Sequence, residues 1–109
     1  MPRAGLDPQI VLQAAAEIVD QHGWETLTLA LLAQKLGIRT PSLYNHVNGL
    51  PGLRRKLAIH GMGKLKEALT NAAIGKSKDT AIRAMAEAYL AFARRHPGLY
   101  EATQRANDW

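Results

Sequence analysis

The chain has 109 residues, of which 47% are hydrophobic and 21% charged, and its formal net charge is +5. This length suits one domain, or a small domain plus part of a second, and the composition excludes a disordered chain. The sequence has no cysteine, which excludes disulfides and thiolate metal sites. No apolar run reaches the roughly 18 residues that cross a bilayer, and the N-terminus lacks a signal-peptide core. We therefore expect a cytoplasmic protein without a membrane partner.

Positive charge is concentrated in the middle of the chain. The stretch from Thr26 to Lys66 contains no Asp or Glu, and all the acidic residues fall outside it. A folded surface of one sign attracts a polyanion, so this stretch favours nucleic acid as the partner over an anionic membrane or a chance distribution. Its cationic residues are Lys35, Arg39, Arg54, Arg55, Lys56, Lys64 and Lys66.

Helix-forming residues dominate and alternating β-branched runs are absent, so an all-α fold is predicted. The first helix is predicted from Pro8 to His22, with Asp7 as its cap and Pro8 at the first helical position, where no N–H is needed. Gly23 supplies the left-handed conformation that ends it. The apolar stripe expected to face the core comprises Ile10, Val11, Ala14, Ala15, Ile18 and Val19.

Two short helices are predicted next. Thr28 caps a helix over residues 29–36, and Gly37 ends it. Thr40 and Pro41 repeat the pattern of a capping residue followed by proline, and they begin a third helix that runs to about residue 47. The Asn-Gly pair at residues 48–49 then breaks that helix.

The second half of the sequence predicts three more helical segments. Pro51 opens a long fourth helix to about residue 73, in which close contact with another helix or a bend would explain Gly61 and Gly63. After a turn at residues 75–78, Ser77 or Asp79 caps a fifth helix. Pro97 interrupts this helix and restarts a sixth segment over residues 98–106.

The stretch from Leu27 to Val47 has the pattern of a helix-turn-helix, in which the second helix of the pair enters the DNA major groove. At 100° per residue, Leu43 and Val47 face inward on the third helix, Pro41, Ser42 and Asn45 face outward, and Tyr44 and His46 lie on the flanks. Small polar and aromatic groups at a positively polarised helix end suit contacts with phosphates and base edges. The alternative is a tight helical hairpin with Tyr44 packed and His46 solvated.

The same stretch closely resembles the DNA-binding segment of the TetR (Tet repressor) family. The Ala-Gln-Lys-Leu-Gly block at 33–37 and the Pro-Ser-Leu-Tyr-x-His-Val block at 41–47 are the most specific parts. The resemblance implies a three-helix, homeodomain-like DNA-binding domain over residues 1–50. Residues 51–109 would form the linking helix and a truncated or partial helical ligand-binding and dimerisation domain.

The family resemblance implies a bacterial, nucleoid-associated, ligand-responsive repressor that binds a palindromic operator in double-stranded DNA. By position, Thr28 would hold a phosphate, Tyr44 and His46 would clamp the backbone, and five residues would face bases or adjoining phosphates: Arg39, Thr40, Pro41, Ser42 and Asn45. Three positions depart from the family pattern. Ala30 stands where some members have an arginine that contacts a base, and Asn45 stands at a position that is often aromatic or basic. Leu50 stands where many members have a lysine that binds a phosphate, and we expect Arg54 or Arg55 to compensate for it.

The resemblance also implies an unknown small-molecule effector and a homodimer in the full-length form. Family members are roughly twice as long as this chain, so the sequence is expected to be either a fragment or an unusually short member. Four residues could form one wall of an effector pocket, although at helical spacing such residues are more often plain core: Met85, Tyr89, Phe92 and Tyr100.

Enzyme activity is not expected. The histidines, at positions 22, 46, 60 and 96, are far apart in sequence and lack ligand spacing, and no Ser-His-Asp order or glycine-rich phosphate loop is present. The sequence therefore predicts no catalytic residues, no metal site and no cofactor. The alternative to a DNA-binding regulator is a helical protein-interaction module that does not bind DNA.

Overall fold

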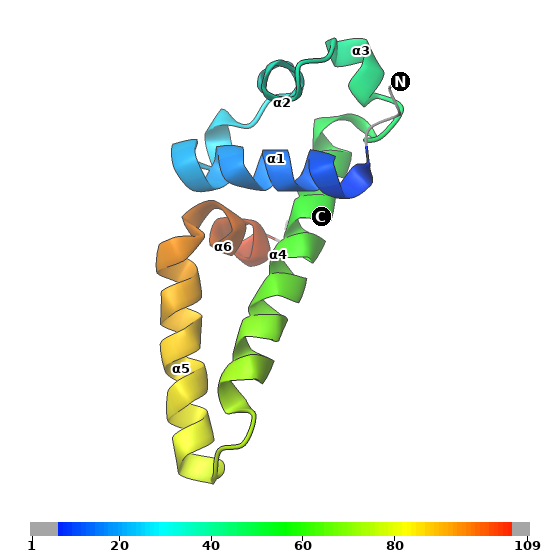
Figure 1. Ribbon diagram of the computed structural model, residues 1–109. Coiled ribbons are helices and arrows are strands. Elements are labelled where there is room, and N and C mark those ends of the chain that lie inside the picture. The colour runs from blue at the N-terminus through cyan, green and yellow to red at the C-terminus, as the bar shows by residue number, and fades with distance from the viewer. Residues whose placement is uncertain (1–6, 106–109) are drawn as a thin grey trace.

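The computed structural model describes residues 7–105, which form six α-helices, one 3-10 turn and no strand (Figure 1). The predicted all-α fold is confirmed. The described part of the chain is elongated, with principal extents of 51 × 31 × 23 Å. None of the helices within residues 7–105 is both long and apolar enough to cross a membrane.

The first helix has the bounds that its flanking residues predict. Helix α1 runs from Pro8 to His22; the Asp7 side chain accepts a hydrogen bond of 2.9 Å from the Gln9 N–H, and Gly23 follows the helix with a φ of 101°. The 3-10 turn η1 (Trp24–Thr26) then directs the Trp24 side chain into the core, where it is 4% exposed. One member of the expected apolar stripe is wrong, because Ile10 is 53% exposed in the first turn of α1.

Helices α2 (Leu29–Leu36) and α3 (Thr40–Leu43) follow as a helix-turn-helix above α1 (Figure 1). The Thr28 hydroxyl oxygen accepts a hydrogen bond of 3.0 Å from the Leu31 N–H, which confirms Thr28 as the cap of α2. Gly37 has a φ of 72°, and the next residue, Ile38, donates its N–H to the Ala33 carbonyl at 3.0 Å. A left-handed glycine followed by such a bond satisfies carbonyls at the end of the helix and fixes the turn.

Two predicted boundaries around α3 are wrong. The residue at the cap position is Arg39 rather than Thr40, no side chain caps α3, and Thr40 is already helical. Regular α-helix ends at Leu43, although hydrogen bonds from His46 and Val47 to the Leu43 carbonyl carry the chain through a further turn. Helix α4 begins at Gly49 rather than Pro51, because Pro51 lies in the first turn, where its missing N–H leaves no bond unmade.

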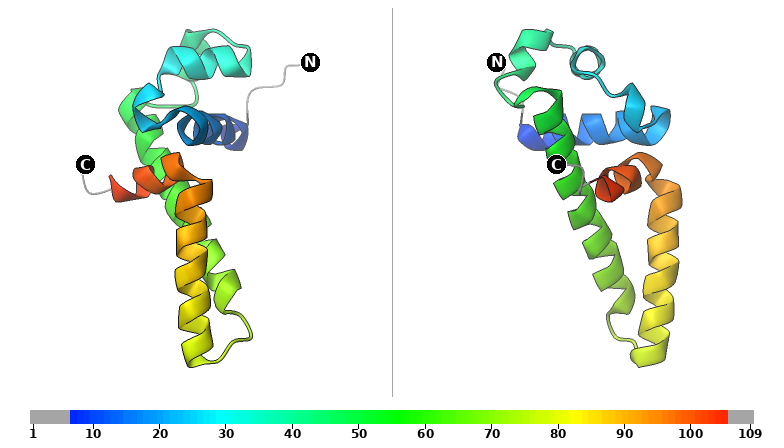
Figure 2. Two further views of the ribbon diagram at one scale, coloured as in Figure 1. Left: turned by 90° about the vertical axis from the view of Figure 1, so that its left-hand side faces the viewer. Right: turned by 180° about the vertical axis from the view of Figure 1, so that it is seen from behind.

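The second half of the described chain is a long hairpin with a short closing helix. Helix α4 (Gly49–Ala73) and α5 (Lys78–Arg95) form the hairpin, and α6 (Pro97–Gln104) packs beneath α1 (Figure 2). Ser77 occupies the position before α5 but makes no capping bond to its backbone. The expected division at residue 50 lies in the first turn of α4, and residues 1–6 and 106–109, including the expected helix end at Ala106, lie outside the described residues.

One hydrophobic core extends from the helix-turn-helix into the top of α4 and α6. Its largest fully buried side chains come from α1, α2, α3, α4 and the residue after η1: Leu27, Leu32, Leu43, Leu53, Leu57, Val11 and Val19. Ala33 is 2% exposed where α2 crosses its neighbours. This shared core holds α3 in a defined position relative to α4.

Helix α6 approaches two other helices through glycines. A Cβ atom on Gly98 would overlap the carbonyl group of Val19 in α1, and one on Gly61 of α4 would lie 3.1 Å from the Leu99 carbonyl oxygen. Asp20 of α1 reaches across the first contact: its Oδ1 accepts hydrogen bonds of 3.0 Å from the N–H groups of Gly98 and Leu99. Of the two explanations offered for the glycines of α4, close helix contact applies at Gly61, where the partner is α6, whereas an added Cβ on Gly63 would have no atom within 4 Å.

Candidate nucleic-acid interface

The exposed side of α3 and of the turn that follows it is the candidate interface. Leu43 is 0% and Val47 6% exposed, so these two residues anchor the segment in the core. Four of the predicted contact residues lie on the opposite side and are exposed to solvent: Pro41, Ser42, Tyr44 and Asn45. Tyr44 is 59% exposed and therefore does not pack in the interior as the hairpin alternative requires.

The remaining predicted contact residues flank this face. Arg39 is exposed at the start of α3 and Thr28 is exposed at the start of α2, while Thr40 and His46 are half-buried. Thr28 uses a lone pair of its hydroxyl oxygen for the cap, so its O–H is still able to donate to a phosphate. These N-terminal helix positions carry free backbone N–H groups and a partial positive charge, which favour anions.

Two cations of α4, Lys56 and Arg54, contact other parts of the N-terminal half rather than extend the exposed face of α3. Lys56 donates from Nζ to the His46 carbonyl oxygen at 3.3 Å. The Arg54 guanidinium lies 5.4 Å from the centroid of the Trp24 ring, and its Nε is buried without a hydrogen-bond partner within residues 7–105. Arg54 thus packs against Trp24. This contact argues against the expectation that Arg54 binds the phosphate that a lysine at position 50 contacts in many family members.

The stretch without acidic residues is partly neutralised by an acid from another helix. Lys35 of α2 forms an ion pair of 3.1 Å with Glu17 of α1. The hydrogen bond from Lys35 lowers the pKa of the Glu17 carboxyl, and a hydrogen bond from Gln13 and the charge of Lys35 lower it further. Arg39 has no such partner among the described residues, so its charge remains available at the edge of the exposed face of α3.

The four candidate effector residues are not brought together as one wall. Phe92 is 6% exposed in the core, with its ring 5.3 Å from that of His96. The rings of Tyr89 and Tyr100 meet edge to face at 5.8 Å, and their hydroxyls are 3.3 Å apart. Tyr100 consequently has a raised pKa, chiefly because of this hydrogen bond. Met85 and Tyr89 border an apolar depression on α5 with Leu69, Ala86 and Leu90.

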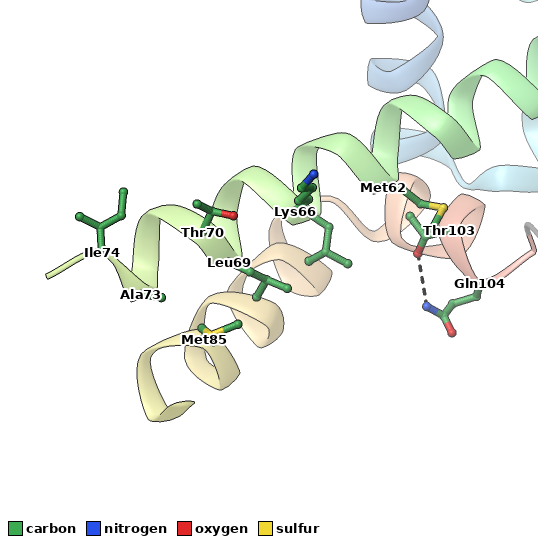
Figure 3. Close-up of a pocket in the computed structure, with 10 residues that line it drawn as sticks. Met62, Lys66, Leu69, Thr70, Ala73, Ile74, Met85, Thr103 and Gln104 are labelled. Carbon is green, nitrogen blue, oxygen red and sulfur yellow. Dashed lines mark hydrogen bonds between the residues drawn. The ribbon is translucent and has the colours of Figure 1, made fainter. Parts of the chain in front are cut away.

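An open apolar groove of about 730 Å³ lies between α4, α5 and α6 (Figure 3). Leu69 of α4 lies beside Met85 of α5 toward one end of the groove, and Met62 of α4 lies beside Thr103 of α6 toward the other end. Sequence reasoning identified only Met85 of this set. The other positions carry the apolar spacing of an ordinary core stripe, which gives no signal that this side of the helix is open.

Comparison with known proteins identifies several helix-turn-helix regulators that are similar to this chain. No family model matches the chain. Over 101 residues, 93% of this chain, it is 44% identical to the HTH-type transcriptional regulator YobS of Bacillus subtilis, and over 94% it is 38% identical to the HTH-type regulator Rv0681 of Mycobacterium tuberculosis. The class D tetracycline repressor of Escherichia coli is 43% identical over 56 residues, and the HTH-type repressor DrrR1 of Streptomyces coeruleorubidus is 34% identical over 103. The chain is a homologue of TetR-like helix-turn-helix regulators.

The TetR-like homology extends well beyond the helix-turn-helix itself but not over whole relatives. The chain spans 53% of the length of YobS, 47% of Rv0681 and 37% of DrrR1. A solved structure of a protein of unknown function from Rhodococcus sp. RHA1 matches 96% of the chain with a TM-score of 0.81 at 24% identity, and the match covers 56% of that protein. This structural match supports the fold alone.

Proposed function

We propose that this TetR-like chain is a sequence-specific DNA-binding transcriptional regulator whose α3 face enters the major groove. The observation that carries the proposal is the division of the α3 segment into a buried side and a solvent-facing side. Leu43 and Val47 fix the segment in the core, whereas Tyr44 and Asn45 point away from it. A rigid short helix with exposed polar side chains suits the reading of base edges.

In this proposal the eight residues named from the sequence divide the work of binding. Asn45 and Ser42 face base edges, since an amide recognises adenine with two hydrogen bonds and a hydroxyl bonds to several bases. Thr28, Thr40 and Arg39 bind phosphates from the positive ends of α2 and α3. Tyr44 and His46 hold the adjacent backbone, and Pro41 packs against the sugar or a thymine methyl.

The proposal extends to a repressor that acts as a homodimer on a palindromic operator. Two copies would place their α3 faces in successive major grooves, about 34 Å apart. As the effector site we propose the apolar side of the hairpin, where Met85 and Tyr89 line the depression and the Tyr100 ring packs against Tyr89; Phe92, whose ring contacts His96, would take part only through the core. This assignment is supported by the apolar lining, because small-molecule sites are mostly apolar clefts.

Gel-shift titration with duplex DNA from the region upstream of the gene tests the proposed interface. Asn45→Ala and Tyr44→Ala are each expected to weaken binding by about 1–3 kcal/mol, or roughly 5- to 150-fold, because each removes a contact to a base or to the backbone. Asn71→Ala is the matched control, since Asn71 is exposed near the far end of α4. Circular dichroism checks that all three variants are folded.

Two results would contradict the proposal. The site assignment is wrong if Asn45→Ala and Tyr44→Ala bind DNA as tightly as Asn71→Ala does. A wild-type chain that shows no salt-dependent binding to duplex DNA would instead favour a protein-interaction module, because each phosphate neutralised contributes a slope of about −0.9 in log K against log salt.

A further inference from the structure

A cleft of about 430 Å³, here called the junction cleft, lies where α1, α4, the end of α5 and the start of α6 meet. Four basic groups line it: His60 and Lys64 on α4, Arg95 at the end of α5, and His96 between α5 and α6. No residue of α2 or α3 lines this cleft, so it is separate from the proposed DNA interface.

The two carboxylates of the junction cleft are already engaged by other groups. Glu17 is paired with Lys35 of α2 at 3.1 Å and accepts a second bond from Gln13. Asp20 accepts at 2.7 Å from Nδ1 of His96 and at 3.0 Å from two backbone N–H groups of α6. Glu17 is therefore in an ion pair with Lys35 and Asp20 accepts three hydrogen bonds, and within the described residues neither carboxylate forms an ion pair with Lys64 or Arg95.

Lys64 and Arg95 are the two cations of the cleft that have no ion-pair partner within residues 7–105. Both side chains are exposed, and within residues 7–105 neither forms an ion pair, including with Glu67 one turn further along α4. The charge of Lys64 is felt inside the cleft. Burial is the main reason that the pKa of His60 is lowered, and the charges of Lys64 and His96 lower it further. The interior of the cleft is therefore a place where added negative charge is favourable.

We propose that the junction cleft binds a small anion that carries a carboxylate or phosphate group, held by Lys64 and Arg95. The planar guanidinium of Arg95 matches two oxygens of either group, and Lys64 supplies a second cation from a different helix. His60 provides a third donor, and Ala16 and Leu99 provide a small apolar surface for the body of the ligand. The volume lies near the lower end of the range for small-molecule sites, roughly 300–1,000 Å³.

Isothermal titration of the 109-residue chain with sodium phosphate and, separately, with sodium propionate tests the proposal, with sodium chloride holding the ionic strength constant. We expect saturable binding of at least one anion, and at least about tenfold weaker binding by the Lys64→Gln/Arg95→Gln double variant. Lys78→Gln/Arg83→Gln is the matched control, because it removes the same charge from exposed positions of α5 outside the cleft. Ring signals of His60 and His96 are expected to shift on titration.

The two salts separate the two ligand classes: a response to phosphate alone assigns a phosphorylated ligand, and a response to propionate alone assigns a carboxylic acid. The proposal is overturned if neither salt binds saturably. It is equally overturned if the double variant binds as well as the wild type, or if the control pair loses as much affinity as the cleft pair. Because no DNA is present, these outcomes are independent of the proposed regulatory function.

Discussion

Gly98→Ala is expected to destabilise the folded chain by about 2–5 kcal/mol, because α6 and α1 touch through their backbones at this residue. An added Cβ would overlap the Val19 carbonyl group and lie 2.7 Å from the Asp20 nitrogen. Backbone atoms on both sides cannot be moved by a rotamer change, so the helices must separate. Such overpacking costs about 1–3 kcal/mol.

Separation of the helices also stretches the bonds that Asp20 accepts from Gly98 and Leu99. Hydrogen bonds to a charged group contribute about 1.5–3 kcal/mol each, and we expect part of this to be lost in addition to the overpacking cost. Against a total stability of about 5–15 kcal/mol for a chain of this size, the change is large enough to measure by urea unfolding monitored by circular dichroism.

Gly63→Ala is the matched control for this experiment. Gly63 lies within α4, is exposed, and has no atom within 4 Å of an added Cβ. Replacing an unconstrained helical glycine with alanine should raise stability by up to about 1 kcal/mol. If Gly98→Ala unfolds at the same urea concentration as Gly63→Ala, or at a higher one, the reasoning about backbone contact is refuted.

Three further outcomes follow from side-chain environments. Leu43→Ala removes a fully buried side chain and should cost about 2–5 kcal/mol in urea unfolding, whereas Tyr44→Ala, which alters the exposed neighbour, should change stability by no more than about 0.5 kcal/mol. The pKa of His60 is lowered in the fold, so its contribution to stability is fully present above its ordinary pKa of about 6.5 and is lost as the pH falls from there through the lowered pKa of the folded state. His60→Gln should therefore make Tm fall less steeply on acidification, and an unchanged slope would contradict this. Lys35→Gln should raise the pKa of the Glu17 carboxyl toward its ordinary range in an NMR titration. An unchanged pKa would show that Lys35 is not the cause of the lowered pKa of Glu17.

The helices whose ends are set by local chemistry were predictable from the sequence. The bounds of α1 and α2 agree with prediction because Asp7, Thr28 and Gly37 each act through bonds or dihedral angles within a few residues. Prediction was wrong at the start of α3. Threonine often caps a helix, but Thr40 already lies inside α3. It was also wrong about the start of α4, which begins at Gly49 rather than Pro51, although the expected break at Asn48 separates α4 from the α3 segment.

The features that depend on distant residues were not predictable. The ion pair between Lys35 and Glu17 shows that a stretch without acids in sequence is not without acids in space. The contact between Asp20 and His96 joins residues 76 positions apart, and nothing in the local pattern of either residue indicates it. The junction cleft depends on that same contact, which explains why sequence analysis singled out neither Lys64 nor Arg95 as a site residue.

The glycine contacts of α6 determine how firmly the two halves of the molecule are joined. At Gly98 the main chain of α6 contacts the main chain of α1 directly, so no side chain lies between these two helices to absorb a displacement. At Gly61 an added Cβ would lie 3.1 Å from the Leu99 carbonyl oxygen and 3.2 Å from the Thr103 side chain. A tilt of α6 must therefore either move α1 with it or break the backbone contact between Gly98 and Val19. Because α1 shares its core with α2 and α3, the orientation of the exposed α3 surface is coupled to the position of α6, which lies far away in the sequence.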